Sequence, residues 1–137
     1  MNKPDSQQRG LAGEYYVASI LSQVGYDVGI TLGRAKVFDM VVIAPHGKTA
    51  NLQVKANYGY NDWLASHFDR NKNSVVALVR LSKDITHRPE LYVLPGQVAD
   101  GLLTHKYPTH SPRISKADVI KQFKDHDLSA LTNLLDR

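Results

Sequence analysis

Residues 38–56, FDMVVIAPHGKTANLQVKA, decide the fold of this chain. Two apolar runs rich in β-branched residues flank the turn segment PHGK, which predicts a β-hairpin. Side chains alternate between the faces of a strand, so Gln53 and Lys55 point to one side and Val54 to the other. Asp39, near the start of the first run, faces them if the register allows. These polar residues are either the wet face of edge strands or parts of a metal-dependent site.

The rest of the chain predicts an α/β domain with a mixed sheet of about four to five strands flanked by helices. A first helix is expected from a cap at Asp5 or Ser6 to a stop at Gly25. Further strands are expected over residues 26–31, 74–81 and 90–95, short helices over 62–69 and 96–106, and two short helices or one bent helix at the C-terminal end. We expect one domain with a core over about 6–104 and a C-terminal helical segment over about 115–137, whose start spaces Ser115 and Asp118 like a capping box.

Length and composition indicate a single globular domain. The chain has 137 residues, of which 42 % are hydrophobic and 22 % charged, so it can bury one core and is not expected to be disordered. It contains no cysteine, which excludes disulfides, thiolate zinc sites and a cysteine nucleophile. No apolar run reaches the roughly 18 residues of a membrane span, and the first ten residues lack a signal-peptide pattern. We expect a soluble, cytoplasmic protein with no membrane contact.

The positive charge is concentrated in the part of the chain that holds the hairpin. Residues 1–88 contain 11 Lys and Arg against 7 Asp and Glu, whereas residues 89–137 contain 6 of each. This local surplus suits a polyanion such as DNA, although a solubilising surface gives the same count. The residues expected at a nucleic-acid surface are Arg34, Lys36, Tyr58, Trp63, Arg70 and Lys72. The aromatic ones either stack on unpaired bases or pack as a lid against their own domain.

The hairpin residues can be combined into a site for phosphodiester hydrolysis. The Asp39 carboxylate, the Gln53 amide oxygen and the Val54 main-chain carbonyl are the oxygen ligands that Mg²⁺ prefers. Lys55 would orient the attacking water or stabilise the charge that develops on the phosphate. A metal there would polarise the phosphate and lower the pKa of its bound water.

These residues resemble a known superfamily. Asp39, a spacer and then Gln53-Val54-Lys55, preceded by Glu14 in the segment GLAGEYYVASILSQVGYDV, are similar to the PD-(D/E)XK nucleases. Within it, the likeness is to Mrr-type restriction enzymes and archaeal Holliday-junction resolvases, over roughly residues 9 to 94. The resemblance implies a restriction-endonuclease-like sheet, Mg²⁺-dependent DNA cleavage in which Mn²⁺ substitutes, and a homodimer. It also implies that Glu14 lies beside the metal. Apart from the resemblance, Glu14 is equally a solvated helix residue.

Two positions depart from the superfamily pattern. The usual second acid is Gln53 here, as in some Mrr-like members, and Phe38 stands where a proline often precedes the first acid. Glu14 and Asp39 supply two negative charges and Lys55 one positive charge, so the site would attract Mg²⁺ less strongly than three carboxylates. These two changes are therefore expected to affect metal affinity most.

Other classes of site find no support in the sequence. The six histidines show no ligand spacing, so zinc is not expected. The chain lacks the glycine-rich phosphate loops of nucleotide enzymes, so no nucleotide cofactor is expected, and it lacks a Gly-x-Ser-x-Gly elbow. Two functions remain: a metal-dependent DNA endonuclease, or a nuclease-like domain that binds nucleic acid or a protein without cutting.

Overall fold

A computed structural model gives the fold, and it describes residues 3–31, 37–59, 61–104 and 111–136. Arg34 and Lys36, both expected at a nucleic-acid surface, lie outside these ranges. In chain order the described elements are α1 (Ser6–Gln23), β1 (Asp27–Ile30), β2 (Met40–Ile43), β3 (Thr49–Tyr58), β4 (Trp63–Leu64), β5 (Ser74–Leu81), β6 (Glu90–Pro95), α2 (Gly96–Leu102), β7 (Leu103–Thr104), β8 (Arg113–Ile114), α3 (Lys116–Gln122) and α4 (Ser129–Leu135).

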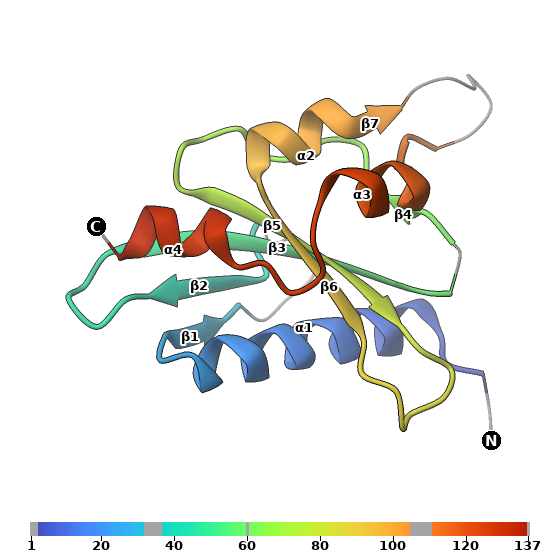
Figure 1. Cartoon of the computed structure of the whole chain (residues 1–137), viewed down its shortest axis with the longest axis horizontal. Coiled ribbons are helices and arrows are strands. Elements are labelled where there is room, and N and C mark those ends of the chain that lie inside the picture. Colours follow the sequence, from blue (N-terminus) through green and yellow to red (C-terminus); the bar gives the residue numbers. More distant parts are fainter. Residues whose placement is uncertain (1–2, 32–36, 60, 105–110, 137) are drawn as a thin grey trace.

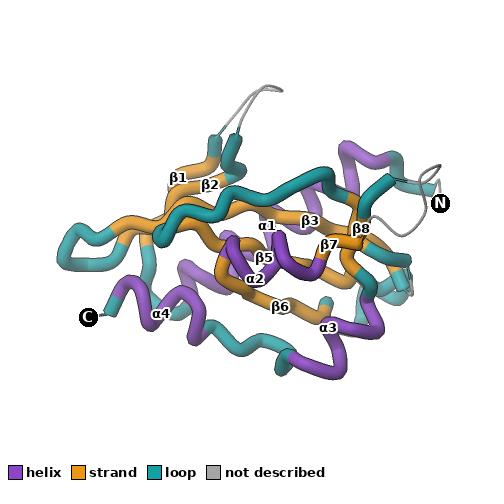
Figure 2. Tube along the Cα trace, turned by 90° about the horizontal axis from the view of Figure 1, so that it is seen from above, coloured by secondary structure: helices purple, strands orange, loops and turns teal. Residues whose placement is uncertain are grey.

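The main sheet is mixed, with its strands in the order β1-β2-β3-β5-β6 (Figure 2). The pairs β1–β2, β2–β3 and β5–β6 are antiparallel, whereas β3 and β5 are parallel. A second sheet of short strands has the order β4-β8-β7. Figure 1 shows α1 on one side of the main sheet and α2 with α3 on the other. The expected α/β fold with a mixed sheet is confirmed.

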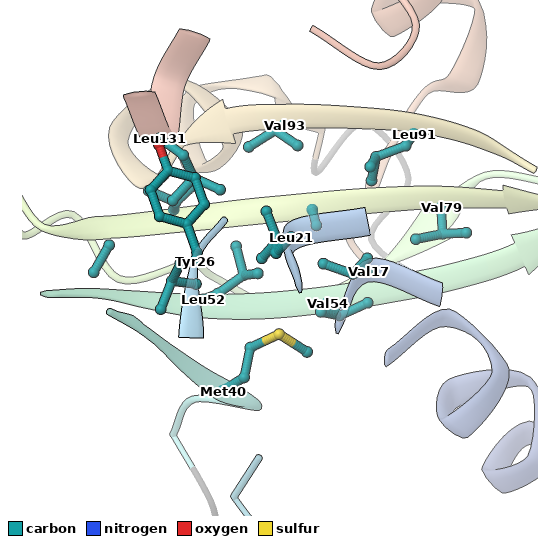
Figure 3. Close-up of a cluster of buried hydrophobic side chains, with 14 of the residues drawn as sticks. Val17, Leu21, Tyr26, Met40, Leu52, Val54, Val79, Leu91, Val93 and Leu131 are labelled. Atoms are coloured by element: carbon teal, nitrogen blue, oxygen red, sulfur yellow. The ribbon is translucent and has the colours of Figure 1, made fainter. Parts of the chain in front are cut away.

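Each face of the main sheet packs its own hydrophobic core. The first core joins α1 and α4 to alternate residues of β3 and β5, among them Leu52 and Val54 (Figure 3). The second core joins Trp63, α2 and α3 to the opposite face of β5, including Val76 and Leu78. Because β5 is buried on both faces, its residues 75–79 form a continuous apolar run in the sequence.

Local signals place most of the elements correctly. Asp5 caps α1 and forms a capping box with Gln8, and Gly25 follows the helix with a φ of 100°, a left-handed conformation that glycine adopts without strain. The strands β5 and β6 have the expected bounds. The C-terminal segment forms two helices, α3 and α4, rather than one bent helix.

Three local expectations are wrong. The helix expected over residues 96–106 ends at Leu102, because Leu103 and Thr104 form β7 and pair with β8. No helix forms over residues 62–69: Trp63 and Leu64 instead pair with Ile114 and Arg113, a tertiary contact that outweighs the local helical pattern. Ser115 does begin α3, but its side chain makes no capping hydrogen bond. Its capping-box spacing is therefore not used.

The C-terminal segment is tied to the rest of the domain by a polar chain. Tyr16 Oη lies 2.7 Å from His126 Nε2, and His126 Nδ1 lies 2.6 Å from Asp125 Oδ1. Asp125 also accepts the Leu91 N–H at 2.9 Å. Since Leu131 of α4 is fully buried in the first core, the segment completes the fold instead of standing apart from it.

None of the helices in the described part of the chain, α1 included, combines the length and the apolar run that crossing a bilayer requires.

Two glycines of α1 should respond oppositely to alanine. A Cβ on Gly13 would lie 2.5 Å from Ala56 Cβ, whereas one on Gly10 would meet nothing within 4 Å. Gly10→Ala should raise the free energy of unfolding by about 0.5–1 kcal/mol through helix propensity. Gly13→Ala should lower it, because overpacking costs about 1–3 kcal/mol and offsets that gain. Urea denaturation measures both; equal stabilisation by the two variants would mean that α1 does not pack closely on β3.

Candidate active site

The site is built where β2 parts from β3. Met40 pairs with Leu52, and continuing that antiparallel register would bring the Phe38 carbonyl to the Val54 N–H. Instead, the Val54 N–H donates to Asp39 Oδ2 at 2.6 Å, and the Asp39 N–H donates to the Leu52 carbonyl at 2.9 Å. The Asp39 side chain thus replaces the next bond of the ladder and ends the pairing of the two strands.

The parting leaves one edge of β3 open beside Asp39. The β2–β3 pairing ends at Leu52, so in the described part of the chain no strand pairs with this edge from Val54 onward. Even-numbered residues of β3 direct their main-chain groups toward the β2 side, since Asn51 donates to Asn73 on the β5 side. The Val54 carbonyl therefore lies at the open edge, on the same side as Asp39.

Gln53 and Lys55 project from the face of β3 that carries the second core. Gln53 is in register with Val76 and Lys55 with Leu78, and both partners belong to that core. Asp39 lies outside the paired register, because its N–H donates to the carbonyl of Leu52, the residue already paired with Met40. The hairpin expected from the sequence is confirmed, with Gln53 and Lys55 half-buried at its open end.

The Gln53 amide oxygen already has a protein partner. It accepts the Asp69 N–H at 3.4 Å, a long hydrogen bond. The Asp69 carboxylate in turn accepts from Ser74 and Asn71. Gln53 therefore orients toward the loop before β5, and any ligand that it binds shares this oxygen with Asp69.

Glu14 is not a solvated helix residue. It is only 8 % exposed and follows Gly13, where α1 touches Val54 and Ala56. That contact is on the first-core face of β3, whereas Lys55 projects from the other face. Glu14 and Lys55 can therefore meet only around the open edge of β3. The approach of Glu14 to a metal beside Asp39 stays a prediction.

A pocket of 260 Å³ occupies this open edge, with Lys55 in its wall. Arg9 of α1 also lines it, a residue that the sequence reasoning did not single out. Nothing in the local pattern marks Arg9, because the pocket arises only when α1, β3 and β4 come together. We call this cavity the edge pocket.

The residues expected to contact nucleic acid differ in their burial and contacts. Trp63 is 1 % exposed, and its Nε1–H donates to the Val79 carbonyl at 3.0 Å. As packed it cannot stack on a base, so the expected stacking role gives way to packing within the domain. Tyr58 is half-buried against the first core. Arg70 is exposed but pairs with Asp100 at 2.7 Å, and Lys72 is exposed.

The donor chemistry of the site fits a hard divalent cation, although its charge is low. The Asp39 carboxylate, the Gln53 amide and the Val54 carbonyl all present oxygen. Within the described ranges, no three His, Cys, Asp or Glu side chains gather into a group that could hold a metal. A cation would therefore depend on the amide, the main-chain carbonyl or a substrate oxygen.

The fold is similar to that of a known nuclease. The solved structure of a bacterial homing endonuclease, I-Ssp6803I, matches with a TM-score of 0.51 and 16 % sequence identity, over 82 % of this chain and 75 % of the other. At this identity the likeness concerns the fold alone. No family model and no curated protein match the chain. The finer likeness to Mrr-type enzymes and Holliday-junction resolvases stays a prediction.

The Asp39–Val54 hydrogen bond should contribute measurably to stability. Asp39→Ala would leave the Val54 N–H without its acceptor, which costs about 1–3 kcal/mol. Asp39→Asn keeps an oxygen there and should lose less. Denaturant unfolding measures the free energies, and amide exchange by NMR follows the Val54 N–H directly. A Val54 amide equally protected in wild type and Asp39→Ala would contradict the proposed replacement of the ladder bond.

Proposed function

We propose that this protein is a metal-dependent DNA endonuclease that hydrolyses phosphodiester bonds at the open edge of β3. The observation that carries the proposal is the juxtaposition of Asp39 with the Val54 main chain, beside a pocket lined by Lys55. An acid and a lysine at the open end of one hairpin can serve a cation and a phosphate together. The similarity of the fold to a homing endonuclease supports the same reaction class.

Asp39, Gln53 and the Val54 carbonyl would hold Mg²⁺ or Mn²⁺, with Glu14 reaching the cation through water. When bound, such a cation supplies polarisation of the phosphate and a bound water of lowered pKa. Asp39 is oriented by a short hydrogen bond from the Val54 N–H and Gln53 by a long one from the Asp69 N–H, so two of the proposed ligands already have protein partners. Held ligands need less reorganisation when substrate arrives.

Lys55 would act on the phosphate itself. Its ammonium group can donate to a non-bridging oxygen and stabilise the negative charge that grows in the transition state. It can also orient the attacking water by a hydrogen bond. Because Lys55 lies in a strand paired with β5, its Cα is held by the main sheet.

A second function is favoured by one observation. The described residues provide no cluster of three metal-binding His, Cys, Asp or Glu side chains, and Gln53 brings no charge. A nuclease-like domain that binds DNA or a protein without cutting would have the same fold. Cleavage assays separate the two functions.

The decisive experiment is DNA nicking with Mg²⁺ or Mn²⁺, using plasmid, branched and single-stranded substrates. The wild type should cut at least one of them, and chelation of the metal should stop the reaction. Lys55→Ala should abolish cleavage and leave DNA binding largely intact, because the main contribution of Lys55 would come in the transition state, when charge grows on the phosphate. Lys48→Ala, which removes the same charge from the exposed β2–β3 turn, is the matched control. If the wild type cuts none of these substrates with either ion, the binding function is the correct one.

The charge of Gln53 should set the metal affinity of the free protein. A neutral amide holds a cation weakly, so metal and DNA should each strengthen binding of the other. Gln53→Glu adds a negative charge and should tighten Mg²⁺ or Mn²⁺ binding by roughly tenfold or more, as one favourable charge interaction allows. Calorimetry with and without DNA measures both effects. Unchanged metal affinity in Gln53→Glu would remove Gln53 from the ligand set.

A further inference from the structure

The edge pocket has walls from three segments that are distant in the sequence. Its lining residues are Ser6, Arg9 and Gly10 of α1, Val54, Lys55, Ala56 and Asn57 of β3, and Trp63 and Leu64 of β4. It therefore spans the open edge of β3, with α1 on one face of the strand and β4 on the other. Any occupant would lie against the same edge that presents the Val54 carbonyl.

The charge of the edge pocket favours an anion. Arg9 and Lys55 are its ionised lining residues, and none of the described residues that line it carries a carboxylate. Arg9 donates through Nη1 to the Pro4 carbonyl at 3.2 Å, which holds the guanidinium group by one of its five N–H donors. A guanidinium held in this way can still bind two phosphate oxygens at once.

The other residues that line the edge pocket are uncharged and suit a sugar better than a second anionic group. Leu64 is 51 % exposed, and Val54 and Ala56 add further apolar surface. The Asn57 side chain is fixed, since it donates to the Asp62 carbonyl at 3.0 Å and accepts the Tyr58 N–H at 2.9 Å. The pocket thus combines two cations with a rigid, partly apolar wall, a combination that matches a sugar-phosphate unit.

The volume limits how much of a nucleic acid can enter. At 260 Å³ the edge pocket lies just below the range of about 300–1,000 Å³ typical of pockets for drug-sized molecules. It can hold one phosphate with its sugar and is too small for a base pair. A base would have to remain outside, so the pocket would read the backbone and not the sequence.

We propose that the edge pocket binds the sugar-phosphate unit adjacent to the scissile phosphate, on the strand that is cut, and that Arg9 positions it. This inference rests on the proposed function, because Lys55 belongs both to the pocket and to the proposed catalytic group. The contact fixes the register of the strand, so the next phosphate along the backbone falls at Asp39 and Lys55. Arg9 is a positioning residue that acts on a neighbouring phosphate and not on the reacting atoms.

Binding to a short labelled DNA duplex, measured by anisotropy without divalent ions, tests the pocket independently of cleavage. Arg9→Ala should weaken binding about tenfold, as loss of a charged hydrogen bond implies, and lower the log–log salt slope by about 0.9. Lys48→Ala, the same charge change at the far end of β3, should weaken binding by less than about twofold, because exposed charges are screened. Arg9→Lys should recover the slope but only part of the affinity, since lysine cannot bind two oxygens in a plane.

The single tryptophan of the chain reports where the DNA binds. Trp63 lines the edge pocket, so DNA should change its emission in the wild type and in Lys48→Ala but not in Arg9→Ala. Thermal unfolding of each variant verifies that it is folded. Equal loss of affinity in Arg9→Ala and Lys48→Ala, or an unchanged Trp63 signal on saturation with DNA, would overturn the inference.

Cleavage by the same variants separates this inference from the proposed function. If the wild type cuts DNA, Arg9→Ala should cut with a higher KM and with less regular cut positions, whereas Lys55→Ala should not cut. Wild-type cleavage that Arg9→Ala leaves unchanged would refute the pocket inference and leave the endonuclease function intact. Absence of cleavage together with an Arg9-dependent binding signal would refute the function and keep the pocket as a DNA site.

Discussion

The hydrogen bond from the Val54 N–H to Asp39 Oδ2 is the constraint on which the site depends. It replaces a main-chain bond at the point where β2 would have continued along β3. A buried N–H needs an acceptor, and a side-chain acceptor satisfies it without a neighbouring strand. One carboxylate therefore ends the pairing, exposes the edge of β3 and fixes its own position there. The same hydrogen bond thus ends the β2–β3 pairing and positions the Asp39 carboxylate.

The strand β3 carries the fold and the site on alternating residues. Leu52 and Val54 pack into the first core, while Gln53 and Lys55 project from the opposite face. Because β3 pairs with β2 at its start and with β5 from Asn51 to Tyr58, its backbone is supported even where one edge is open. The polar side chains thus extend from a rigid strand, which holds their geometry better than a loop would.

The sequence predicts those parts of the structure that arise from nearby residues. The cap at the start of α1, the hairpin and the bounds of β5 all follow from local propensity and spacing. The pairing of Trp63 with Ile114 does not, since these residues are about fifty positions apart and their contact depends on the finished core. The edge pocket and the burial of Glu14 also depend on tertiary contacts, so local patterns do not predict them. Local patterns identify the residues of one hairpin, whereas a cavity between three elements requires the tertiary structure.

The oxygen atoms of the site and the cations of the edge pocket complement each other. Asp39 Oδ2 and Gln53 Oε1 each accept a main-chain N–H, so the oxygens are held in place but bring only one negative charge. Under the proposed function, such a site would orient a divalent cation without attracting it strongly. Under the proposed function, Arg9 and Lys55 would attract the opposite partner, a phosphate. A DNA backbone bound in the edge pocket would bring its own negative oxygens to the oriented ligands. Because Gln53 is neutral, the site carries little negative charge without DNA, and metal binding would then depend on the substrate.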